Sequence, residues 1–351
     1  MTVGQAAEPH KPAIRLRGRV GEPAEVTSRR WGTLRSLRSE AVQGYVFLFP
    51  AVLLLLVFHL LPVAYALFLS LFDARVFKDM WSPGPFIGGG NYARLLTNPD
   101  FAQSLANTVW FAGLTVPLGL CLAVLFAQLL NARIWGRTSY RVTYFLPYVT
   151  STVAAAVVWR WIFQPRVGVA NSVMEWLGLP GQQWADEPRG VFLLVGQLFG
   201  VPLEGWLAGP SLALVTVALV SVWYSVGFNT VITLAGLTTI PLDLYEAARI
   251  DGAGPWRLFR HITLPLLTPT LLFLLIIETI RSFQSFDFFY QMMAGNPVPG
   301  AKVVTVFLYQ QGFKSFNLGF AAAIGMVLFV IIFGLTLVQF RATRSRVVYA
   351  D

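Results

Sequence analysis

Six apolar runs, each close to or above the length of a membrane-spanning helix, dominate this sequence. An α-helix needs about 20 apolar residues to cross roughly 30 Å of hydrocarbon. A segment inside a bilayer must satisfy its own backbone hydrogen bonds, which leaves helices or closed barrels as spanning structures. The sequence therefore predicts an all-α membrane protein with six transmembrane helices. The runs are Tyr45–Leu69, Ser104–Leu130, Val142–Phe163, Ser211–Leu234, Leu266–Phe289 and Leu318–Phe340.

The composition supports a membrane protein and argues against several other classes. Hydrophobic residues make up 56% of the chain and charged residues only 12%, whereas about a quarter of a soluble domain is charged. The net charge of +9 is spread over the segments between the apolar runs, so membrane topology explains it better than nucleic-acid binding. A single cysteine and three separated histidines rule out a disulfide within the chain and give no pattern typical of a metal site.

The basic residues predict which side of the membrane each segment occupies. If the N-terminal segment is cytoplasmic, the segments on that side hold more than twice as many Lys and Arg residues as the segments on the other side. Because cytoplasmic loops are enriched in these residues, both termini are expected in the cytoplasm. Residues 1–42 are then a retained basic tail, being too long and too polar for a signal peptide. The membrane domain covers 43–341, and 342–351 form a C-terminal tail.

A polar segment at 246–265 separates the fourth and fifth apolar runs. Pro241 suits the first turn of a helix, which is expected to end near Ile250. Gly252 then supplies the freedom for a bend, and Pro255 can start a second helical turn. The segment is therefore predicted to form a helix, a bend and a helix that do not cross the bilayer. The charge distribution places this element in the cytoplasm.

The same segment resembles the cytoplasmic loop of a known family, the permease subunits of binding-protein-dependent sugar ABC importers, which include maltose and glycerol-3-phosphate systems. The match rests on Glu246, Ala247, Ala248, Gly252, Ile262, Leu264 and Pro265. In that family the loop is a coupling helix that sits in a cleft of the ATP-hydrolysing subunit. Without the resemblance, the segment would be read as an amphipathic helix on the membrane surface. The resemblance implies coupling contacts from Glu246, Ala247, Ala248, Asp251, Gly252, Ala253, Trp256 and Phe259.

The resemblance extends over about Tyr45 to Phe340 and includes Asn91-Tyr92, ahead of the second apolar run. Two features depart from the family pattern. The outer segment at about 182–204 is longer than usual, and its apolar stretch from Val191 to Val201 is too short to span, so an interfacial helix or hairpin is expected there. Arg281 also stands where a small residue is more usual.

Polar residues inside the fifth apolar run are the main candidates for contact with a transported molecule, because each needs a partner or a wet cavity at membrane depth. Glu278 and Arg281 are three residues apart and are expected either to neutralise each other or to meet substrate. On one continuous helix, Gln284 and Asp287 would lie on a different face from this pair. We favour the face of Gln284 and Asp287, because an uncharged sugar is held by acceptors and amide donors beside aromatic rings.

Other candidates leave two interpretations open. Asn229, in the fourth run, is expected to contact either substrate or a neighbouring helix. Phe283 and Phe286 are expected either to flank a sugar or to pack against other helices. The full set of candidate pathway residues is Gln284, Asp287, Asn229, Phe283, Phe286, Glu278 and Arg281.

The sequence lacks the residues needed to hydrolyse ATP. A phosphate-binding loop requires a lysine after a glycine, and none of the lysines follows one. No catalytic residues are assigned, and ATP and Mg are expected on a partner subunit. The resemblance implies a second, similar permease subunit, two ATP-binding subunits and an extracytoplasmic solute-binding protein, in a prokaryotic inner membrane.

The expected cargo is a di- or oligosaccharide or a related sugar, with glycerol-3-phosphate or a glycerophosphodiester as the alternative. A less favoured alternative is an ion-coupled secondary carrier, which should show a midplane relay and an inverted repeat. A membrane-embedded enzyme would need a nucleophile with a base, or a metal cluster. The sequence shows no pattern typical of either class.

Overall fold

The computed structural model describes residues 32–75, 84–131, 136–198, 200 and 205–344. Within these ranges the chain is helical, and its β pairing is confined to isolated bridges. Four helices are long and apolar enough to cross a membrane, or up to six spans if each of two bent helix pairs counts as one. The expected all-α class is confirmed, whereas the count of six depends on those two bent pairs.

The chain divides into two compact units, residues 1–61 and 62–351. In the first unit, α1 (Gly32–Leu55) is followed by the π-helical turn η1 (Leu56–Leu60). From Val42 onward its large apolar side chains are exposed, as in a helix that faces lipid. The basic residues expected in the tail before Gly32 lie outside the described residues, so the boundary at residue 42 stays a prediction.

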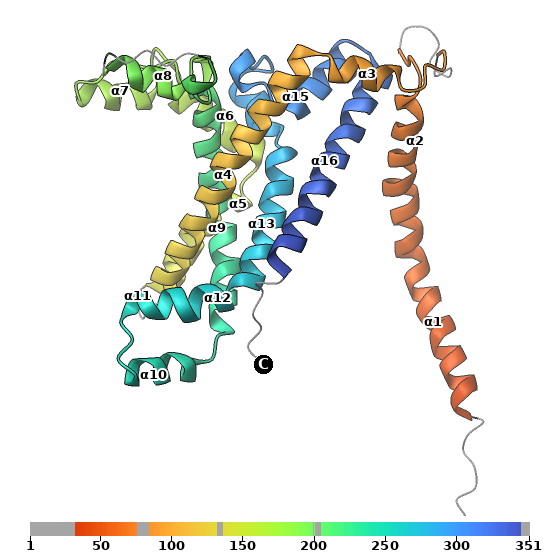
Figure 1. Ribbon diagram of the computed structural model, residues 1–351, viewed down its shortest axis with the longest axis vertical. Coiled ribbons are helices and arrows are strands. Elements are labelled where there is room, and N and C mark those ends of the chain that lie inside the picture. Colours follow the sequence, from red (N-terminus) through yellow and green to blue (C-terminus); the bar gives the residue numbers. More distant parts are fainter. Residues whose placement is uncertain (1–31, 76–83, 132–135, 199, 201–204, 345–351) are drawn as a thin grey trace, which may run out of the picture. The chain divides into compact units, whose positions relative to one another are not determined.

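Four long helices form the centre of the second unit and run side by side (Figure 1). Small residues bring them close together, as is common between helices in membranes. A Cβ at Gly227 of α9 would lie 1.9 Å from the Tyr144 carbonyl oxygen of α5, so these two backbones touch directly. The helices are α4 (Pro99–Asn131), α9 (Leu212–Thr238), α13 (Thr268–Phe283) and α16 (Leu318–Arg344), and α5 (Arg137–Val149) packs along α9.

The third and fifth apolar runs are not single helices, which corrects the expectation of six continuous spans. α5 and α6 (Thr152–Ile162) are bent by 95°, with Thr150 and Ser151 extended between them. The helix over Pro255–Leu266 is bent by 65° from α13. Prolines lie beside both bends, at Pro147 and Pro265, where each lacks a backbone donor and disrupts the helix.

The shorter elements gather at the two ends of the central helices (Figure 1). The segments expected outside and inside the cell thus lie at opposite ends, although the orientation itself stays a prediction. One end carries α3 (Gly90–Leu96), α7 (Val169–Trp176), η2 (Trp184–Asp186), α8 (Val191–Leu198), η3 (Gly205–Ala208), α14 (Asp287–Met292), η5 (Pro299–Ala301), α15 (Val304–Tyr309) and η6 (Gln310–Lys314). The other end carries α10 (Leu242–Ile250), α11 (Pro255–Leu258), η4 (Phe259–Thr263) and α12 (Leu264–Leu266).

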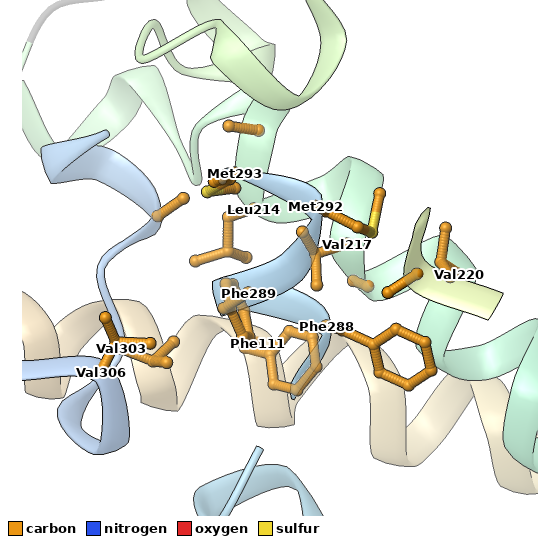
Figure 2. Close-up of a cluster of buried hydrophobic side chains, with 14 of the residues drawn as sticks. Phe111, Leu214, Val217, Val220, Phe288, Phe289, Met292, Met293, Val303 and Val306 are labelled. Atoms are coloured by element: carbon orange, nitrogen blue, oxygen red, sulfur yellow. The ribbon is translucent and has the colours of Figure 1, made fainter. Parts of the chain in front are cut away.

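A buried hydrophobic cluster fixes the short helix α14 against α4 and α9 (Figure 2). The rings of Phe111 and Phe289 meet edge to face, with centroids 4.8 Å apart. Full burial of such aromatic side chains supplies the largest packing contribution per residue. Asp287 is the first residue of α14, so this buried cluster holds its backbone in place. The labelled members are Phe111, Leu214, Val217, Val220, Phe288, Phe289, Met292, Met293, Val303 and Val306.

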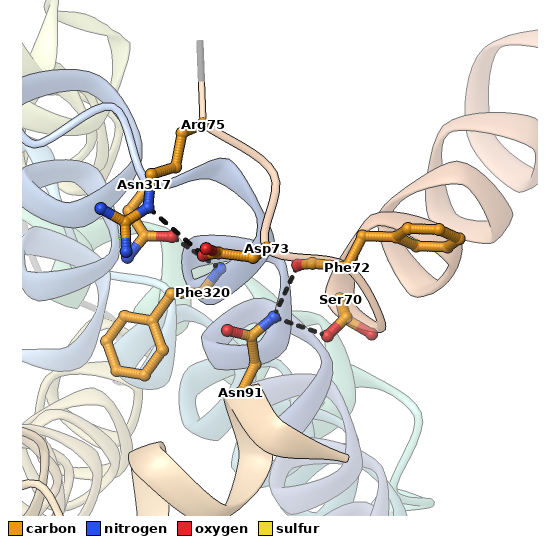
Figure 3. A network of polar contacts seen from close by, with 7 residues as sticks. All are labelled: Ser70, Phe72, Asp73, Arg75, Asn91, Asn317 and Phe320. Carbon is orange, nitrogen blue, oxygen red and sulfur yellow. Dashed lines mark hydrogen bonds and ion pairs between the residues drawn. The ribbon is translucent and has the colours of Figure 1, made fainter. Parts of the chain in front are cut away.

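Hydrogen bonds join the end of α2 (Leu61–Ser70) to α3 (Figure 3). The Asn91 side-chain nitrogen donates to the carbonyl oxygens of Ser70 and Phe72, at 2.8 and 2.9 Å. The hydroxyls of Ser70 and Tyr92 are 2.7 Å apart. Asn91 thus satisfies backbone carbonyls at the end of a membrane helix, where unpaired carbonyls are costly, and Tyr92 contacts the hydroxyl of Ser70.

Candidate functional site

The polar segment between α9 and α13 forms the predicted helix, bend and helix. α10 ends at Ile250, and Gly252 follows with φ +80°. Its N–H donates to the Arg249 carbonyl at 3.0 Å, which closes the helix end in the manner of a left-handed glycine cap. Pro255 then begins α11 as expected. Pro241 differs slightly from the prediction, since it lies one residue before α10 rather than within its first turn.

This end element, residues 241–266, presents large apolar side chains to its surroundings. Leu242, Ile250 and Trp256 are 73%, 86% and 68% exposed. The Trp256 and Phe259 rings lie together, with centroids 5.7 Å apart. Exposed apolar groups surrounded by charged residues are typical of a surface that binds another protein. Of the predicted coupling residues, Glu246, Ala247, Asp251, Gly252 and Trp256 are exposed, and Ala248, Ala253 and Phe259 are half-buried.

The end element is anchored to the central helices through its inner side. The hydroxyls of Tyr245 and Thr263 are 2.9 Å apart and join α10 to the helix that leads into α13. Tyr245 and Ile262 also pack against a buried cluster from α4, α9 and the start of α13. The inner side of the end element therefore contacts several long helices at once. The buried members are Ala127, Leu130, Leu234, Leu237, Ile240 and Leu267.

A cavity of about 270 Å³ lies among the central helices, at the broken part of the fifth apolar run. It mixes charged, hydroxyl and aromatic side chains, as small-molecule sites commonly do. Its walls come from five helices and the break between α13 and α14. The lining residues are Phe111, Thr115, Thr152, Ser221, Tyr224, Ser225, Glu278, Arg281, Ser282, Gln284, Ser285, Phe286, Asp287 and Phe288.

The break after Phe283 corrects the expected geometry of the fifth run. α13 ends at Phe283, and Gln284 and Phe286 leave the helical conformation before α14 begins. The face of Glu278 and Arg281 and the face of Gln284 and Asp287, which were expected to point in different directions, therefore border the same cavity. Glu278 and Arg281 line it together with Gln284 and Asp287, so the expectation of a continuous helix is wrong.

The predicted pair of Glu278 and Arg281 is formed. Their side chains are 3.2 Å apart. The Arg281 guanidinium also donates to the Tyr148 hydroxyl at 2.9 Å and lies over the rings of Tyr148 and Phe228, at 5.1 and 5.5 Å from their centroids. Ion pairing and stacking on aromatic rings together stabilise a cation away from bulk water. Arg281 is therefore paired and stacked within this chain, with 36% of its side chain exposed.

Asp287 is exposed within the cavity at the start of α14. Its carboxylate accepts a hydrogen bond from the Thr152 hydroxyl, at 3.0 Å. Thr152 begins α6, just after the bend in the third run, and the Tyr224 hydroxyl contacts the Tyr148 and Thr150 carbonyls beside that bend, at 3.2 Å each. The third and fifth apolar runs, both broken, thus meet at the exposed carboxylate of Asp287.

Not every predicted pathway residue lines the cavity. Phe283 is 5% exposed and packs in a separate cluster with residues of α4, α15 and α16. Asn229 is fully buried, and its side-chain nitrogen lies near Gly119 of α4. Neither of its polar side-chain atoms has a hydrogen-bond partner in the part of the chain that the structure describes. Phe286 does line the cavity and stacks on Tyr290, with ring centroids 5.0 Å apart.

Sequence reasoning missed the cavity residues contributed by other helices. Tyr148, Thr152 and Thr115 contact residues more than 130 positions away, as in the 2.9 Å hydroxyl contact between Thr115 and Ser282. Hydroxyl groups inside apolar runs are a weak signal, because many bond only to their own helix. The position of these residues beside the cavity depends on how the helices pack.

The segment at 182–204, which was expected to be an outer insertion, forms part of a second pocket, of about 590 Å³. Asp186 of η2 lines it together with two arginines. Arg160 lies in the last turn of α6, and Arg166 follows that helix. Next to it, Arg189 holds the buried Glu187 through two hydrogen bonds of 2.8 Å, and these lower the pKa of the Glu187 carboxyl. The expected helix in this segment is present as α8, while residues 199 and 201–204 lie outside the described part.

These features define a class: a helical membrane permease that has an internal polar cavity and an exposed element at one end of its helices. Comparisons with known proteins give the family. Residues 115–345 match the family described as binding-protein-dependent transport system inner membrane component. Because the match covers more than half of the chain, the protein belongs to this family of ABC transporter permease subunits, in which ATPase activity lies in separate subunits.

Several relatives match over nearly their whole length. The trehalose/maltose transport system permease protein MalF of Thermococcus litoralis is 33% identical, over 88% of this chain and 95% of its own. The arabinooligosaccharides permease protein AraP of Bacillus subtilis is 32% identical, over 92% and 95%. The sn-glycerol-3-phosphate permease protein UgpA of Pectobacterium atrosepticum is 30% identical, over 87% and 95%.

A solved structure shows the same fold. A chain of a bacterial ABC transporter involved in the import of the acidic polysaccharide alginate aligns with a TM-score of 0.70 and 22% identity, covering 89% of this chain and 99% of that one. A second structure of a bacterial alginate transporter, in complex with an alginate-bound periplasmic protein, aligns with the same score over 92% of this chain and 100% of that one.

Proposed function

We propose that the chain is one half of the pathway of an ATP-driven importer that moves a di- or oligosaccharide, or a related sugar, into the cytoplasm. The observation that carries this proposal is the cavity at the break between α13 and α14, where Gln284, Asp287 and hydroxyl groups face the rings of Tyr224 and Phe286. Carboxylate, amide and hydroxyl groups can bond to sugar hydroxyls, and aromatic rings provide apolar surface for the faces of the sugar.

The roles of the cavity residues follow from their positions. Asp287 and Gln284 are exposed and would bind the hydroxyls of the sugar directly. Phe286 would contact a ring face. Glu278 and Arg281 would shape the wall as a closed pair. Asn229 and Phe283, being buried away from the cavity, would act through helix packing rather than through direct contact with substrate.

Energy for transport would enter through the end element at residues 241–266. ATP-driven closure of partner subunits would move α10 as a rigid body, and its anchored inner side would carry α4, α9 and α13 with it. Such rocking exchanges inward-facing and outward-facing states, and it is driven by the difference in ATP affinity between them. Glu246, Asp251 and Trp256 are the exposed residues that we expect to contact the ATP-binding subunit.

The proposed assembly contains a second, similar permease subunit, two ATP-binding subunits that carry ATP and Mg, and an extracytoplasmic solute-binding protein. Support comes from the family and from the alginate transporter structure that includes a periplasmic protein. The complex would lie in a prokaryotic inner membrane with both chain termini in the cytoplasm. Residues 43–341 would form the membrane domain, between the tails at 1–42 and 342–351, and 182–204 would be an outer insertion.

Glycerol-3-phosphate or a glycerophosphodiester is the alternative cargo, because one relative is named for glycerol-3-phosphate transport. A phosphate would need an available cation. In this chain the cation of the cavity, Arg281, is already paired with Glu278 and stacked on Tyr148. This arrangement favours a sugar.

Uptake by the reconstituted complex tests the proposal. The permease, its partner permease and the ATP-binding subunits would be placed in proteoliposomes with ATP inside and the solute-binding protein outside. Radiolabelled di- and oligosaccharides and glycerol-3-phosphate would be offered as separate cargoes. We expect ATP-dependent accumulation of a saccharide together with stimulated ATP hydrolysis. Accumulation of glycerol-3-phosphate alone, or uptake that continues without ATP, would contradict the proposal.

A further inference from the structure

The charges of the cavity bear on which sugars it accepts. Among the described residues that line it, Glu278, Arg281 and Asp287 are the charged ones. The first two neutralise each other in an ion pair of 3.2 Å. Asp287 is bonded only by the neutral hydroxyl of Thr152 among the described residues. This chain therefore gives the cavity one net negative charge.

The charge of Arg281 is already balanced by Glu278, although 36% of the Arg281 side chain is exposed. Its guanidinium is bonded to Glu278 and Tyr148 and is stacked on two aromatic rings. A carboxylate or phosphate on the cargo that replaced Glu278 as the partner of Arg281 would leave behind a carboxylate whose side chain is only 6% exposed. Leaving a buried carboxylate without its partner is strongly unfavourable.

Asp287 also disfavours an anionic cargo. An ionised carboxylate only accepts hydrogen bonds, so it can bind the hydroxyls of a neutral sugar but repels a second anion. Helices line the cavity, and close to a protein surface the repulsion between two charges is stronger than it is in bulk water. Family membership does not decide the matter, since the relatives are named for trehalose and maltose as well as for glycerol-3-phosphate.

We propose that this cavity selects uncharged glycosides and excludes sugars that carry a carboxylate or a phosphate. Asp287 is the residue that determines this specificity, and the ion pair of Glu278 and Arg281 leaves no net positive charge to attract an anion. The inference rests on the proposed function, because it assumes that cargo occupies the cavity.

The test compares the binding of two matched probes. One is maltose, and the other is maltose with one C6 alcohol oxidised to a carboxylate. Binding to the complete importer, trapped with ATP and vanadate in lipid nanodiscs, would be measured by equilibrium dialysis without the solute-binding protein, whose own selectivity would otherwise contribute. We expect the wild-type complex to prefer maltose by roughly tenfold, the size of one charge interaction at moderate dielectric.

Three variants separate charge from other effects. Asp287→Asn removes the net charge, and the preference should fall to about onefold to threefold. Glu278→Gln also removes it and frees Arg281, so the preference should vanish or reverse. The double variant Glu278→Gln with Arg281→Gln has the wild-type net charge again and should regain the preference for maltose. If Glu278→Gln fails to assemble, Asp287→Asn and the double variant still decide the question.

The outcomes distinguish this inference from the proposed function. Equal wild-type affinity for the two probes, or an unchanged preference in Asp287→Asn, would overturn charge selection while leaving sugar import intact. If the complex binds neither probe, and imports cargo of another chemical class, the proposed function fails and this inference fails with it.

Discussion

The end element at residues 241–266 and the cavity at the break after Phe283 are built in different ways. The end element is local: short helices, their prolines and one left-handed glycine present exposed apolar and acidic groups. The cavity is assembled from five helices, and its polar contacts join residues more than 130 positions apart. An exposed apolar surface can thus be encoded in one stretch of sequence, whereas the cavity needs several packed helices.

The largest expected effect comes from breaking the bend of the end element. Gly252→Val places a β-branched residue at φ +80°, a conformation that costs such residues about 1–3 kcal/mol. The bend should shift, and both uptake and stimulated ATP hydrolysis should be lost while the protein still inserts. Proteoliposome uptake and membrane fractionation would measure this.

Gly254→Ala is the matched control. Gly254 lies two residues away in the same bend, with φ −74°, and a methyl group added there would have no other atom within 4 Å. We expect near-normal uptake from this variant. Equal loss in both variants would mean that any change in the bend is damaging, and normal uptake in Gly252→Val would remove the coupling role.

The next effect concerns the packing of α9 against α5. Gly227→Ala would put a methyl group 1.9 Å from the Tyr144 carbonyl oxygen and force α9 away from α5. Overpacking of this kind typically costs about 1–3 kcal/mol, so the thermal midpoint of the purified complex should fall by several degrees. Gly113→Ala in α4, where a Cβ meets nothing within 4 Å, should leave the midpoint unchanged. Equal midpoints for both variants would refute direct backbone contact.

A smaller effect is expected from removing the hydrogen bond between Thr152 and Asp287 in the cavity. Thr152→Val removes the hydroxyl that donates to Asp287 and keeps a similar volume. One hydrogen bond to a charged acceptor contributes about 1.5–3 kcal/mol, but Asp287 is exposed and water can replace the donor. We therefore expect a rise in the KM for sugar of about threefold to tenfold, with kcat little changed. An unchanged KM would show that the position of Asp287 does not depend on Thr152.

The smallest effect is a pH dependence in the outer segment. Hydrogen bonds from Arg189 lower the pKa of Glu187 below its ordinary 4.5. A lowered carboxyl pKa contributes stability that is present above the unfolded value and is lost as the pH falls through the folded value. Because Arg189 is half-exposed, the contribution is small, about 1–2 °C in the thermal midpoint.

Glu187→Gln isolates that contribution. The variant should be less stable than wild type at pH 7, and the difference should shrink below pH 4.5, the ordinary pKa. Asp186→Asn, at an exposed neighbour with no ion pair among the described residues, serves as the comparison. A stability difference for Glu187→Gln that is the same at pH 7 and in acid would rule out the ion pair as its cause.

The sequence predicted the features that depend on neighbours along the chain. Pro255 and Gly252 marked the bend, and the spacing of Glu278 and Arg281 indicated their ion pair, because a separation of three residues places side chains on one helix face. The helix in the outer segment was expected from the apolar stretch that begins at Val191 and is present as α8.

The sequence could not reveal features that depend on tertiary packing. The break after Phe283 contains neither proline nor glycine, so a continuous helix was the natural expectation. The contact of Asp287 with Thr152 spans 135 positions. Burial of Asn229 without a polar partner among the described residues likewise reflects the close approach of α4, which no local pattern encodes.

Photocrosslinking from position 256 in intact cells tests the central claim most directly. Trp256, 68% exposed at the end element, would be replaced by a photoreactive phenylalanine derivative. Phe313, 62% exposed, belongs to η6, one of the short elements at the opposite end of the central helices, and would serve as the control position. The account predicts an adduct with the ATP-binding subunit from position 256 and none from position 313. An adduct between position 256 and the solute-binding protein, or reaction of that position with a membrane-impermeant reagent outside the cell, would contradict it.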